Sequence, residues 1–357
     1  MHTKKKMFMR IKYGLILLFL SSFSLLFAQK DPMFTLYPWA QSFYNPAAMG
    51  EKELHLNFTG ILRQVDIGFK VEKNKDDTEG SSNQKPQYEK FKGQQILLNI
   101  DSYIKQIKGA VSITFLKDKN LYNDNIGFNF GYAAKIPVRG GKLGIGLQFG
   151  FLNQKPPKKD KFNPIQNPDP TIEDLDKSDS FLDFDINFGL HYKAPTWYVG
   201  LSCNQILGGV RVSGEKKHFP PVRNLYAMGG YIWNLKTPVP WSIEPSLIIQ
   251  SDFSTWSMGI MALARYNGII WFGSSYQLNN GIAVLFGAVP FYNSTNPYLK
   301  GIEIGLAYTF QTKKYSWQSG GGSWGDFEIL IRYGFNFFKE KPLTGYGSSR
   351  HLYKNQY

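Results

Sequence analysis

LGIGLQFGF, residues Leu143–Phe151, decides the fold of this chain. Its apolar residues at alternate positions are separated by Gly144, Gly146, Gln148 and Gly150. Because successive side chains of a β-strand point to opposite faces, the segment would carry one apolar face and one small or polar face. A strand needs these two faces when lipid covers one side and the inside of a barrel lies on the other. The segment therefore predicts a membrane-spanning β-barrel.

The same alternation recurs along the chain in 14 segments of strand length. An even number of strands is typical of bacterial single-chain barrels, so we predict an all-β fold, a transmembrane antiparallel up-and-down outer-membrane β-barrel of about 14 strands. The predicted strands are residues 54–69, 94–104, 109–116, 126–136, 143–152, 181–192, 197–206, 225–235, 241–249, 256–266, 269–276, 281–288, 301–310 and 326–338.

The connections between these segments alternate between short and long. The short ones are residues 105–108, 137–142, 193–196, 236–240 and 267–268, and the long ones are residues 70–93, 153–180, 207–224 and 311–325. Outer-membrane barrels have short periplasmic turns and longer external loops, so we expect the short connections to face the periplasm. Asn267-Gly268 fits a type I′ turn. Residues 289–300 break the pattern: either they form a long periplasmic connection, or the predicted strands are wrong there by one hairpin.

The first 28 residues have the pattern of a Sec signal peptide. A basic region precedes an apolar stretch at residues 14–27, and Ala28 is a small residue at the expected cleavage point. Cleavage near Ala28 removes five positive charges and no negative ones, so the formal net charge falls from +14 to +9. We then expect residues 29–53 to form an N-terminal segment, residues 54–338 the outer-membrane barrel, and residues 339–357 a C-terminal tail.

Residues 181–192 indicate which face of the wall points inward. Two aspartates alternate there with leucine, isoleucine and phenylalanine. A carboxylate is costly in lipid, so both aspartates are predicted to face a wet lumen, and the same alternation extends the prediction to the last two strands. The lumen-facing candidates are Asp183, Asp185, Glu303, Glu328 and Arg332.

Aromatic residues near strand ends favour lipid contact over the competing fold, a soluble β-sandwich, whose strands also alternate. Aromatic girdles form where a barrel wall meets the two membrane interfaces. The predicted girdle residues are Trp197, Trp241, Trp256, Trp271 and Tyr308.

Patterns for catalysis or metal binding are absent from the sequence. The histidines lack zinc spacing, no G-x-S-x-G elbow occurs, and Cys203 is the only cysteine. Asp183, Asp185 and His191 could form a hydrolase site in the lumen, but strand alternation alone accounts for them. We therefore predict a non-enzymatic protein with no catalytic residue, no metal and no cofactor.

Residues 29–50, QKDPMFTLYPWAQSFYNPAAMG, differ from the rest of the chain. Three prolines exclude a regular helix or a central strand, and five aromatic side chains need cover. We expect this segment either to enter the barrel as a partial plug or to form a periplasmic arm that a partner orders. The two alternatives differ in whether the lumen is open.

This segment resembles the opening of the PorP/SprF family of the Bacteroidetes type IX secretion system. That family begins with a Q-x-DP-x-F/Y-S-x-Y stretch and continues to a YNPA-x-x-G turn. Arg63-Gln64 and the final stretch DFEILIRYGF from Asp326 also match, whereas Val65-Asp66 replaces the aromatic residue usual after the Arg-Gln pair. The matching residues of the first segment are Asp31, Pro32, Phe34, Tyr37, Tyr44, Asn45, Pro46, Ala47 and Gly50.

The resemblance implies a barrel that works beside the secretion translocon and helps particular cargo, such as adhesins of gliding motility, to be exported or held at the cell surface. It implies as partners the cargo protein, translocon or periplasmic peptidoglycan-linker subunits, and outer-membrane lipid with lipopolysaccharide, but no nucleic acid. Two other functions stay open: a passive diffusion porin or solute channel, and an outer-membrane barrel hydrolase. We expect cargo contacts in the long connections 153–180 and 207–224, since loops on a rigid scaffold usually carry recognition.

Overall fold

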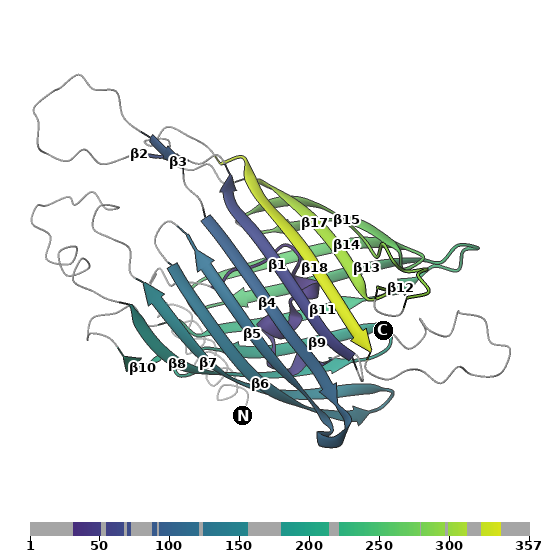
Figure 1. Ribbon diagram of the computed structural model, residues 1–357, viewed down its shortest axis with the longest axis horizontal. Coiled ribbons are helices and arrows are strands. Elements are labelled where there is room, and N and C mark those ends of the chain that lie inside the picture. Colours follow the sequence, from purple (N-terminus) through teal and green to yellow (C-terminus); the bar gives the residue numbers. More distant parts are fainter. Residues whose placement is uncertain are drawn as a thin grey trace, which may run out of the picture.

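The computed structural model describes residues 31–50, 55–67, 70–72, 88–90, 93–120, 124–155, 180–213, 221–278, 280–296, 299–312 and 323–336. They form a barrel from a 16-stranded sheet in which β10 (Val210–Ser213) and β12 (Trp233–Asn234) are short additions, which leaves 14 barrel strands (Figure 1). The barrel strands are β1 (His55–Ile67), β4 (Gly93–Ile104), β5 (Gly109–Lys119), β6 (Asp124–Val138), β7 (Gly141–Lys155), β8 (Phe181–Lys193), β9 (Trp197–Asn204), β11 (Asn224–Tyr231), β13 (Trp241–Ser251), β14 (Trp256–Tyr266), β15 (Ile270–Gln277), β16 (Gly281–Ala288), β17 (Ile302–Gln311) and β18 (Gly325–Asn336).

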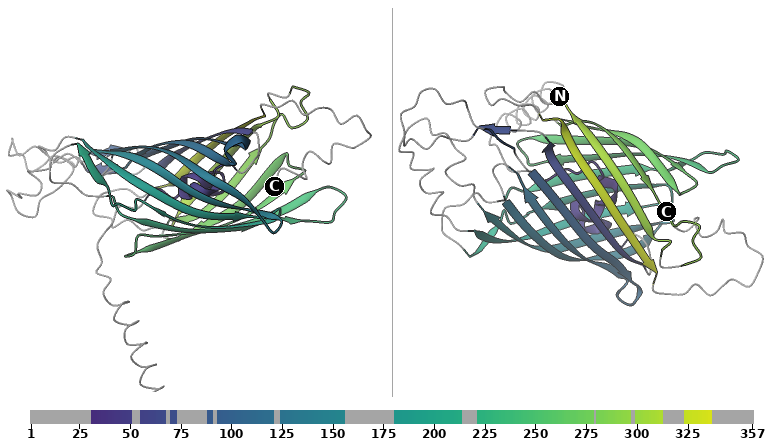
Figure 2. Two further views of the ribbon diagram at one scale, coloured as in Figure 1. Left: turned by 90° about the horizontal axis from the view of Figure 1, so that it is seen from below. Right: turned by 45° about the horizontal axis from the view of Figure 1, so that its top comes forward.

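Antiparallel pairing closes the wall completely. The first strand pairs with the last, with Leu56 opposite Phe335, and β8 pairs with β9, with Phe188 opposite Cys203. Closure gives every barrel strand two neighbours, so no strand edge faces lipid. The predicted closed barrel of 14 strands is confirmed. Two views from other directions show the same wall around one interior (Figure 2).

The predicted strand ends lie within three residues of the observed ones, with one exception. The stretch 225–235 is broken at Ile232 into β11 and β12. Two long connections predicted as loops also contain short strands: β10 pairs with β8, and β2 (Lys70–Glu72) pairs with β3 (Tyr88–Lys90). Strands extend beyond the apolar stretches because backbone pairing continues past the last lipid-facing side chain.

The connections at one end of the barrel are short, except for the connection 289–300 between β16 and β17. Asn267 and Gly268 have φ values of 49° and 70°, and the N–H of Ile269 donates to the carbonyl of Tyr266 at 2.9 Å, as in the predicted type I′ turn. The long connection at 289–300 is real, because β16 pairs directly with β17, with Ala288 opposite Ile304. No hairpin is missing there.

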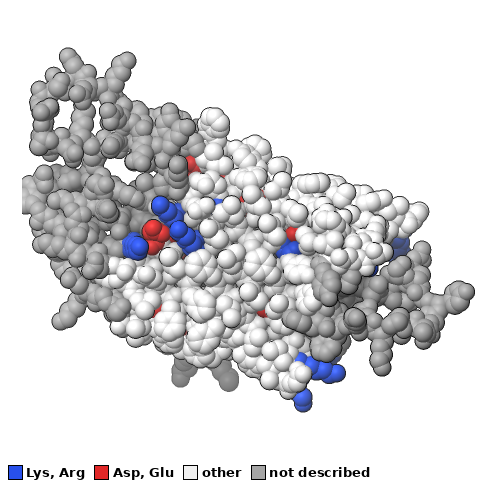
Figure 3. All heavy atoms as spheres, in the orientation of Figure 1, with Lys and Arg blue, Asp and Glu red and all other residues white. Residues whose placement is uncertain are grey.

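The outer wall is apolar and the inner wall is mixed. Along β7, Ile145, Leu147 and Phe151 are exposed on the outside, while Gln148 is buried inside. Most of the wall that faces the viewer in Figure 3 is uncharged, as a lipid-covered surface requires. Among the described residues, no helix is long and apolar enough to cross a membrane.

One predicted girdle residue is wrong. Trp271 is fully buried inside the barrel, whereas its neighbours Ile270 and Phe272 are exposed on the outside. Space for the indole comes from the next two strands, because a Cβ atom at Gly287 or Gly305 would lie 2.1 or 2.7 Å from the ring. Glycines on β16 and β17 therefore allow Trp271 to face the inside of the barrel.

The lumen holds an apolar core rather than bulk water. Residues 31–50, drawn in purple in Figure 1, lie inside the barrel and are surrounded by its strands. Of these 20 residues, 15 are buried. Their turns are η1 (Tyr37–Trp39), α2 (Gln41–Tyr44) and η2 (Pro46–Ala48), and a further turn, η3 (Lys105–Ile107), joins β4 to β5. Residues 31–50 occupy the lumen that was expected to surround the inward-facing carboxylates with water, and the aromatic residues of the segment find their cover on inward-facing Ile61, Leu97, Ile248, Met261 and Leu330.

Candidate functional site

The interface between residues 31–50 and the inner wall is the candidate site, and its first part is a buried ion cluster. Glu328 is fully buried and accepts hydrogen bonds from the backbone N–H of Thr35 at 2.7 Å and of Leu36 at 3.0 Å. Arg63 approaches the same carboxylate at 3.5 Å and donates to the carbonyl of Met33 at 2.9 Å. One cation therefore holds a wall carboxylate and the segment together.

Asp326 completes this cluster. It forms a close ion pair with Arg63 and also accepts from the backbone N–H of Asp66 at 2.9 Å. Charges taken out of water are expensive, and removing one partner of a buried pair costs about 3–5 kcal/mol because the other charge stays unpaired. The cluster thus fixes the segment at one position along β1 and β18.

Asp31 anchors the beginning of the segment. Its carboxylate accepts from the hydroxyl of Tyr226 at 2.8 Å and from the amide of Gln205 at 3.0 Å, while its carbonyl accepts from Gln250 at 3.2 Å. Burial raises the pKa of Asp31 to about 6, and these two donors offset only part of that effect. Its charge therefore changes near neutral pH.

An aromatic stack anchors the middle of the segment. The rings of Trp39 and Trp271 lie 4.5 Å apart between centroids, and the indole N–H of Trp271 donates to Glu303 at 2.9 Å. Glu303 also accepts from Arg265 at 3.3 Å and lies 3.7 Å from Arg332. The hydrogen bond to Glu303 thereby orients the indole ring of Trp271, against which Trp39 of the segment packs.

The YNPA turn anchors the end of the segment. The side-chain amide of Asn45 donates to the carbonyls of Leu190 at 3.0 Å and Leu201 at 3.3 Å, and its oxygen accepts from the N–H of Ala47 at 2.8 Å. The hydroxyl of Tyr44 joins the two halves of the segment, since it accepts from the N–H of Phe34 at 2.8 Å and donates to the carbonyl of Pro32 at 3.2 Å. Asn45 thus bridges two neighbouring wall strands, β8 and β9.

Glycines on the wall make room for this turn. A Cβ atom at Gly144 or Gly146 would lie 2.4 Å from backbone atoms of Ala47, and one at Gly189 would lie 2.0 Å from the side-chain oxygen of Asn45. Gly50 adopts φ +64°, where a Cβ atom would meet Ala110 at 2.2 Å. Gly144 and Gly146 belong to β7, the strand whose sequence first indicated a barrel, and they leave the space in which the YNPA turn packs.

The remaining family-motif residues, Phe34, Tyr37 and Pro46, are buried at the same interface. Tyr37 shares a hydrogen bond of 2.8 Å with Ser246 on β13. All nine matching residues therefore belong to one structural unit.

The five lumen-facing candidates all lie on the inner side but do not form one site. Glu328 contacts the segment directly, and Glu303 and Arg332 belong to the group around Trp271. Asp185 accepts backbone N–H bonds from Ile186, Leu207 and Gly209 at 2.7 to 2.9 Å. It therefore folds the connection after β9 back against β8.

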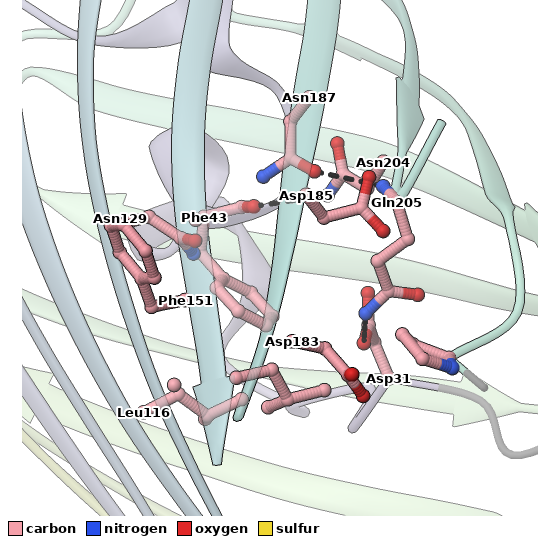
Figure 4. A pocket seen from close by; sticks show the side chains of 14 residues that line it. Asp31, Phe43, Leu116, Asn129, Phe151, Asp183, Asp185, Asn187, Asn204 and Gln205 are labelled. Carbon is pink, nitrogen blue, oxygen red and sulfur yellow. Dashed lines mark hydrogen bonds between the residues drawn. The ribbon is translucent and has the colours of Figure 1, made fainter. Parts of the chain in front are cut away.

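Asp183 lines a cavity of about 50 Å³ between the segment and strands β5 to β9, with Asp31, Phe43 and Gln205 among the other lining residues (Figure 4). Such a cavity has room for about one or two water molecules. His191 lies against Tyr198 instead, at 5.6 Å between ring centroids. In the described parts of the chain no group of three His, Cys, Asp or Glu residues is arranged to hold a metal ion.

Three charged residues of the interior, Arg63, Asp326 and Arg265, were not predicted to lie there from the sequence. Strand parity was the available signal for Arg63, which alternates with the exposed Leu62. It was obscured because Ile61 is apolar and yet faces inward, with an exposed fraction of 1%. Polarity identifies the inner face only where no apolar segment covers it.

A family model described as "Type IX secretion system membrane protein PorP/SprF" matches residues 26–333. The chain belongs to this family. The match spans both the interior segment and the barrel wall, so the two parts described above make up one family domain. No curated protein matches this chain.

Solved structures resemble this family member. A TodX deltaS2S3 mutant, a monoaromatic hydrocarbon channel, has 10% identity and a TM-score of 0.50, and the alignment covers 84% of this chain and 94% of that chain. A Pseudomonas aeruginosa FadL homologue has 11% identity and a TM-score of 0.47, with coverage of 84% and 94%. The TodX likeness concerns the fold alone. The closed barrel with its apolar outer wall and the family match place this PorP/SprF protein in the outer membrane.

Proposed function

We propose that this protein is a non-enzymatic accessory barrel of type IX secretion, which binds a specific cargo protein at its long-loop end while its lumen stays closed. The single observation that carries the proposal is the packing of residues 31–50 against the inner wall. In this member of a secretion-system family, one segment of the chain occupies the lumen of the barrel. A protein built to pass solutes needs a continuous water path, whereas this interior is occupied by packed aromatic side chains.

The long-loop end is favoured for cargo binding by the way its loops are held. Asp185 fixes the start of the connection 207–224, and β10 adds to the edge of β8 next to it. The connection 153–180 leaves from the neighbouring strand, although residues 156–179 lie outside the described residues. Two adjacent connections on a rigid rim offer a surface of the size that protein recognition uses.

The short-turn end would then face the periplasm, where translocon or peptidoglycan-linker subunits are available. The signal peptide at residues 1–28 and the tail at 339–357 remain predictions, since both lie outside the described residues. Contact with lipopolysaccharide is likewise a proposal, based on a wall whose apolar band requires lipid.

The test is affinity purification of a tagged copy from native membranes in mild detergent, with mass spectrometry of the proteins that co-purify. Recovery of a large surface protein or of translocon subunits supports the proposal. Deletion of residues 156–179 should abolish cargo recovery without loss of barrel folding, and a deletion in the turn 236–240 serves as the control. Full cargo recovery by the loop deletion contradicts the assignment of the binding surface.

A solute channel is the second candidate, because the TodX neighbour is named a monoaromatic hydrocarbon channel. Planar-bilayer recordings discriminate the two functions. A channel conducts or transports without any partner, whereas the accessory barrel stays closed.

A further inference from the structure

The two ends of the interior segment lie at opposite mouths of the barrel. Asp31 is bound by residues at the long-loop mouth: Gln205 follows the last residue of β9, Tyr226 is near the start of β11, and Gln250 is near the end of β13. The ends of β9 and β11 adjoin the long connection 207–224, and Gln250 lies at the same end of the wall because it is paired opposite Tyr226. The beginning of the segment is therefore at the long-loop mouth.

Gly50 lies at the other mouth. Its N–H donates to Asp101 at 2.7 Å, and it packs against Tyr103 and Ala110, which flank the short turn between β4 and β5. Shortly before it, the carbonyl of Ala47 accepts from Lys135 at 2.8 Å. The segment therefore leaves the lumen at the short-turn mouth.

The first barrel strand agrees with this path. β1 starts at His55, and Leu56 lies opposite Ser102 near the end of β4 and opposite Phe335 near the end of β18. A chain that entered from the short-turn side would have to run through the lumen and return before reaching β1. The contacts instead order the segment from one mouth to the other, with Thr35 on Glu328, Trp39 on Trp271 and Asn45 on Leu190 in between.

We infer that the chain threads the barrel from the long-loop mouth to the short-turn mouth, so that Asp31 lies at the cell-surface end of the interior segment, beside the rim proposed to bind cargo. The contact with cargo rests on the proposed function, whereas the threading rests only on the contacts above. The interior segment therefore begins at the cell surface, whereas the first barrel strand begins in the periplasm. The partner that meets it is the secreted cargo protein itself, at the rim formed by β8, β9 and β11.

Cysteine labelling with a membrane-impermeant maleimide tests the threading. The native thiol is removed by Cys203→Ser, and Lys30→Cys is compared with Ser180→Cys at the long-loop mouth and Thr237→Cys in an exposed short turn. Cells that lack the cargo are used, so that the result does not depend on its binding. Lys30→Cys and Ser180→Cys should label equally in intact and permeabilised cells, while Thr237→Cys should label only after permeabilisation.

If Lys30→Cys labels only after permeabilisation, as Thr237→Cys is expected to do, the inferred threading is wrong. Labelling of Thr237→Cys but not Ser180→Cys in intact cells overturns the placement of this mouth at the cell surface. Contact with cargo has its own arm: biotin attached at Lys30→Cys and covered by streptavidin should strongly reduce cargo capture by the protein in detergent. The same cover at Thr312→Cys, an exposed residue at the long-loop mouth remote from β8 to β11, should not. Unchanged capture with the cover at Lys30→Cys overturns the contact and leaves the threading intact.

Discussion

Glu328→Ala is expected to release the first half of the interior segment and open the barrel. The side chain is fully buried, and it is the acceptor for the backbone N–H groups of Thr35 and Leu36. Without it, both N–H groups lose their acceptor in a site that excludes bulk water. Arg63 keeps its pair with Asp326, so the barrel wall retains most of its own ion cluster.

The magnitude follows from the two orphaned donors. A buried polar group left without a partner costs about 1–3 kcal/mol, so the docked state loses about 2–6 kcal/mol. At about 1.4 kcal/mol per tenfold, the ratio of undocked to docked segment rises by a factor between about 30 and about 20,000. Water that enters the vacated site moves the result toward the lower limit.

Single-protein recordings in planar bilayers are the assay, because an undocked segment leaves a conducting path. Wild-type protein should stay closed, and Glu328→Ala should show frequent openings. Glu244→Ala is the matched control, since this interior carboxylate bonds to Ser242 and Arg265 rather than to the segment. A correctly folded Glu328→Ala protein that is as closed as wild type refutes the reasoning that these hydrogen bonds hold the segment.

Three further outcomes are expected from the same interface. Gly146→Ala should displace the YNPA turn and increase the open fraction, because its Cβ atom would lie 2.4 Å from the backbone of Ala47, whereas Gly127→Ala, with its nearest neighbour at 3.6 Å, should record like wild type. Burial raises the pKa of Asp31 to about 6, so the docked segment favours the neutral carboxyl. Docking is therefore strongest below pH 4 and weakens as the pH rises through 6. Openings should increase from pH 4.5 to 7.5, and Asp31→Asn should remove this dependence. Trp271→Ala removes a fully buried ring and should lower the free energy of unfolding by about 3–5 kcal/mol. The thermal unfolding midpoint, measured in detergent, should fall accordingly.

The sequence indicated the barrel because lipid and lumen impose a period of two on every strand. Leu143–Phe151 carried this signal without any knowledge of its neighbours, and the short and long connections gave the hairpin order. The aspartates of β8 could be assigned to the inner face for the same reason, since a carboxylate in lipid is prohibitive. These are properties that one strand and its surroundings determine locally.

Long-range contacts decided the rest. Glu328 lies 293 residues after Thr35, and no local pattern relates them. Trp271 was assigned to the wrong face because its place depends on Gly287 and Gly305 of the two following strands and on Trp39 of the segment. An aromatic residue fits a lipid girdle or an interior stack equally well until its neighbours are known.

By itself, the sequence determined that this chain is an outer-membrane barrel with an irregular, aromatic N-terminal segment of PorP/SprF type. Only the tertiary structure decided that the segment lies in the lumen, against Arg63, Glu328 and the glycines of β7 and β8. The physical reason is that strand alternation is dictated by the solvent on each face, whereas the position of the segment depends on shape and hydrogen-bond partners that meet only when the barrel closes.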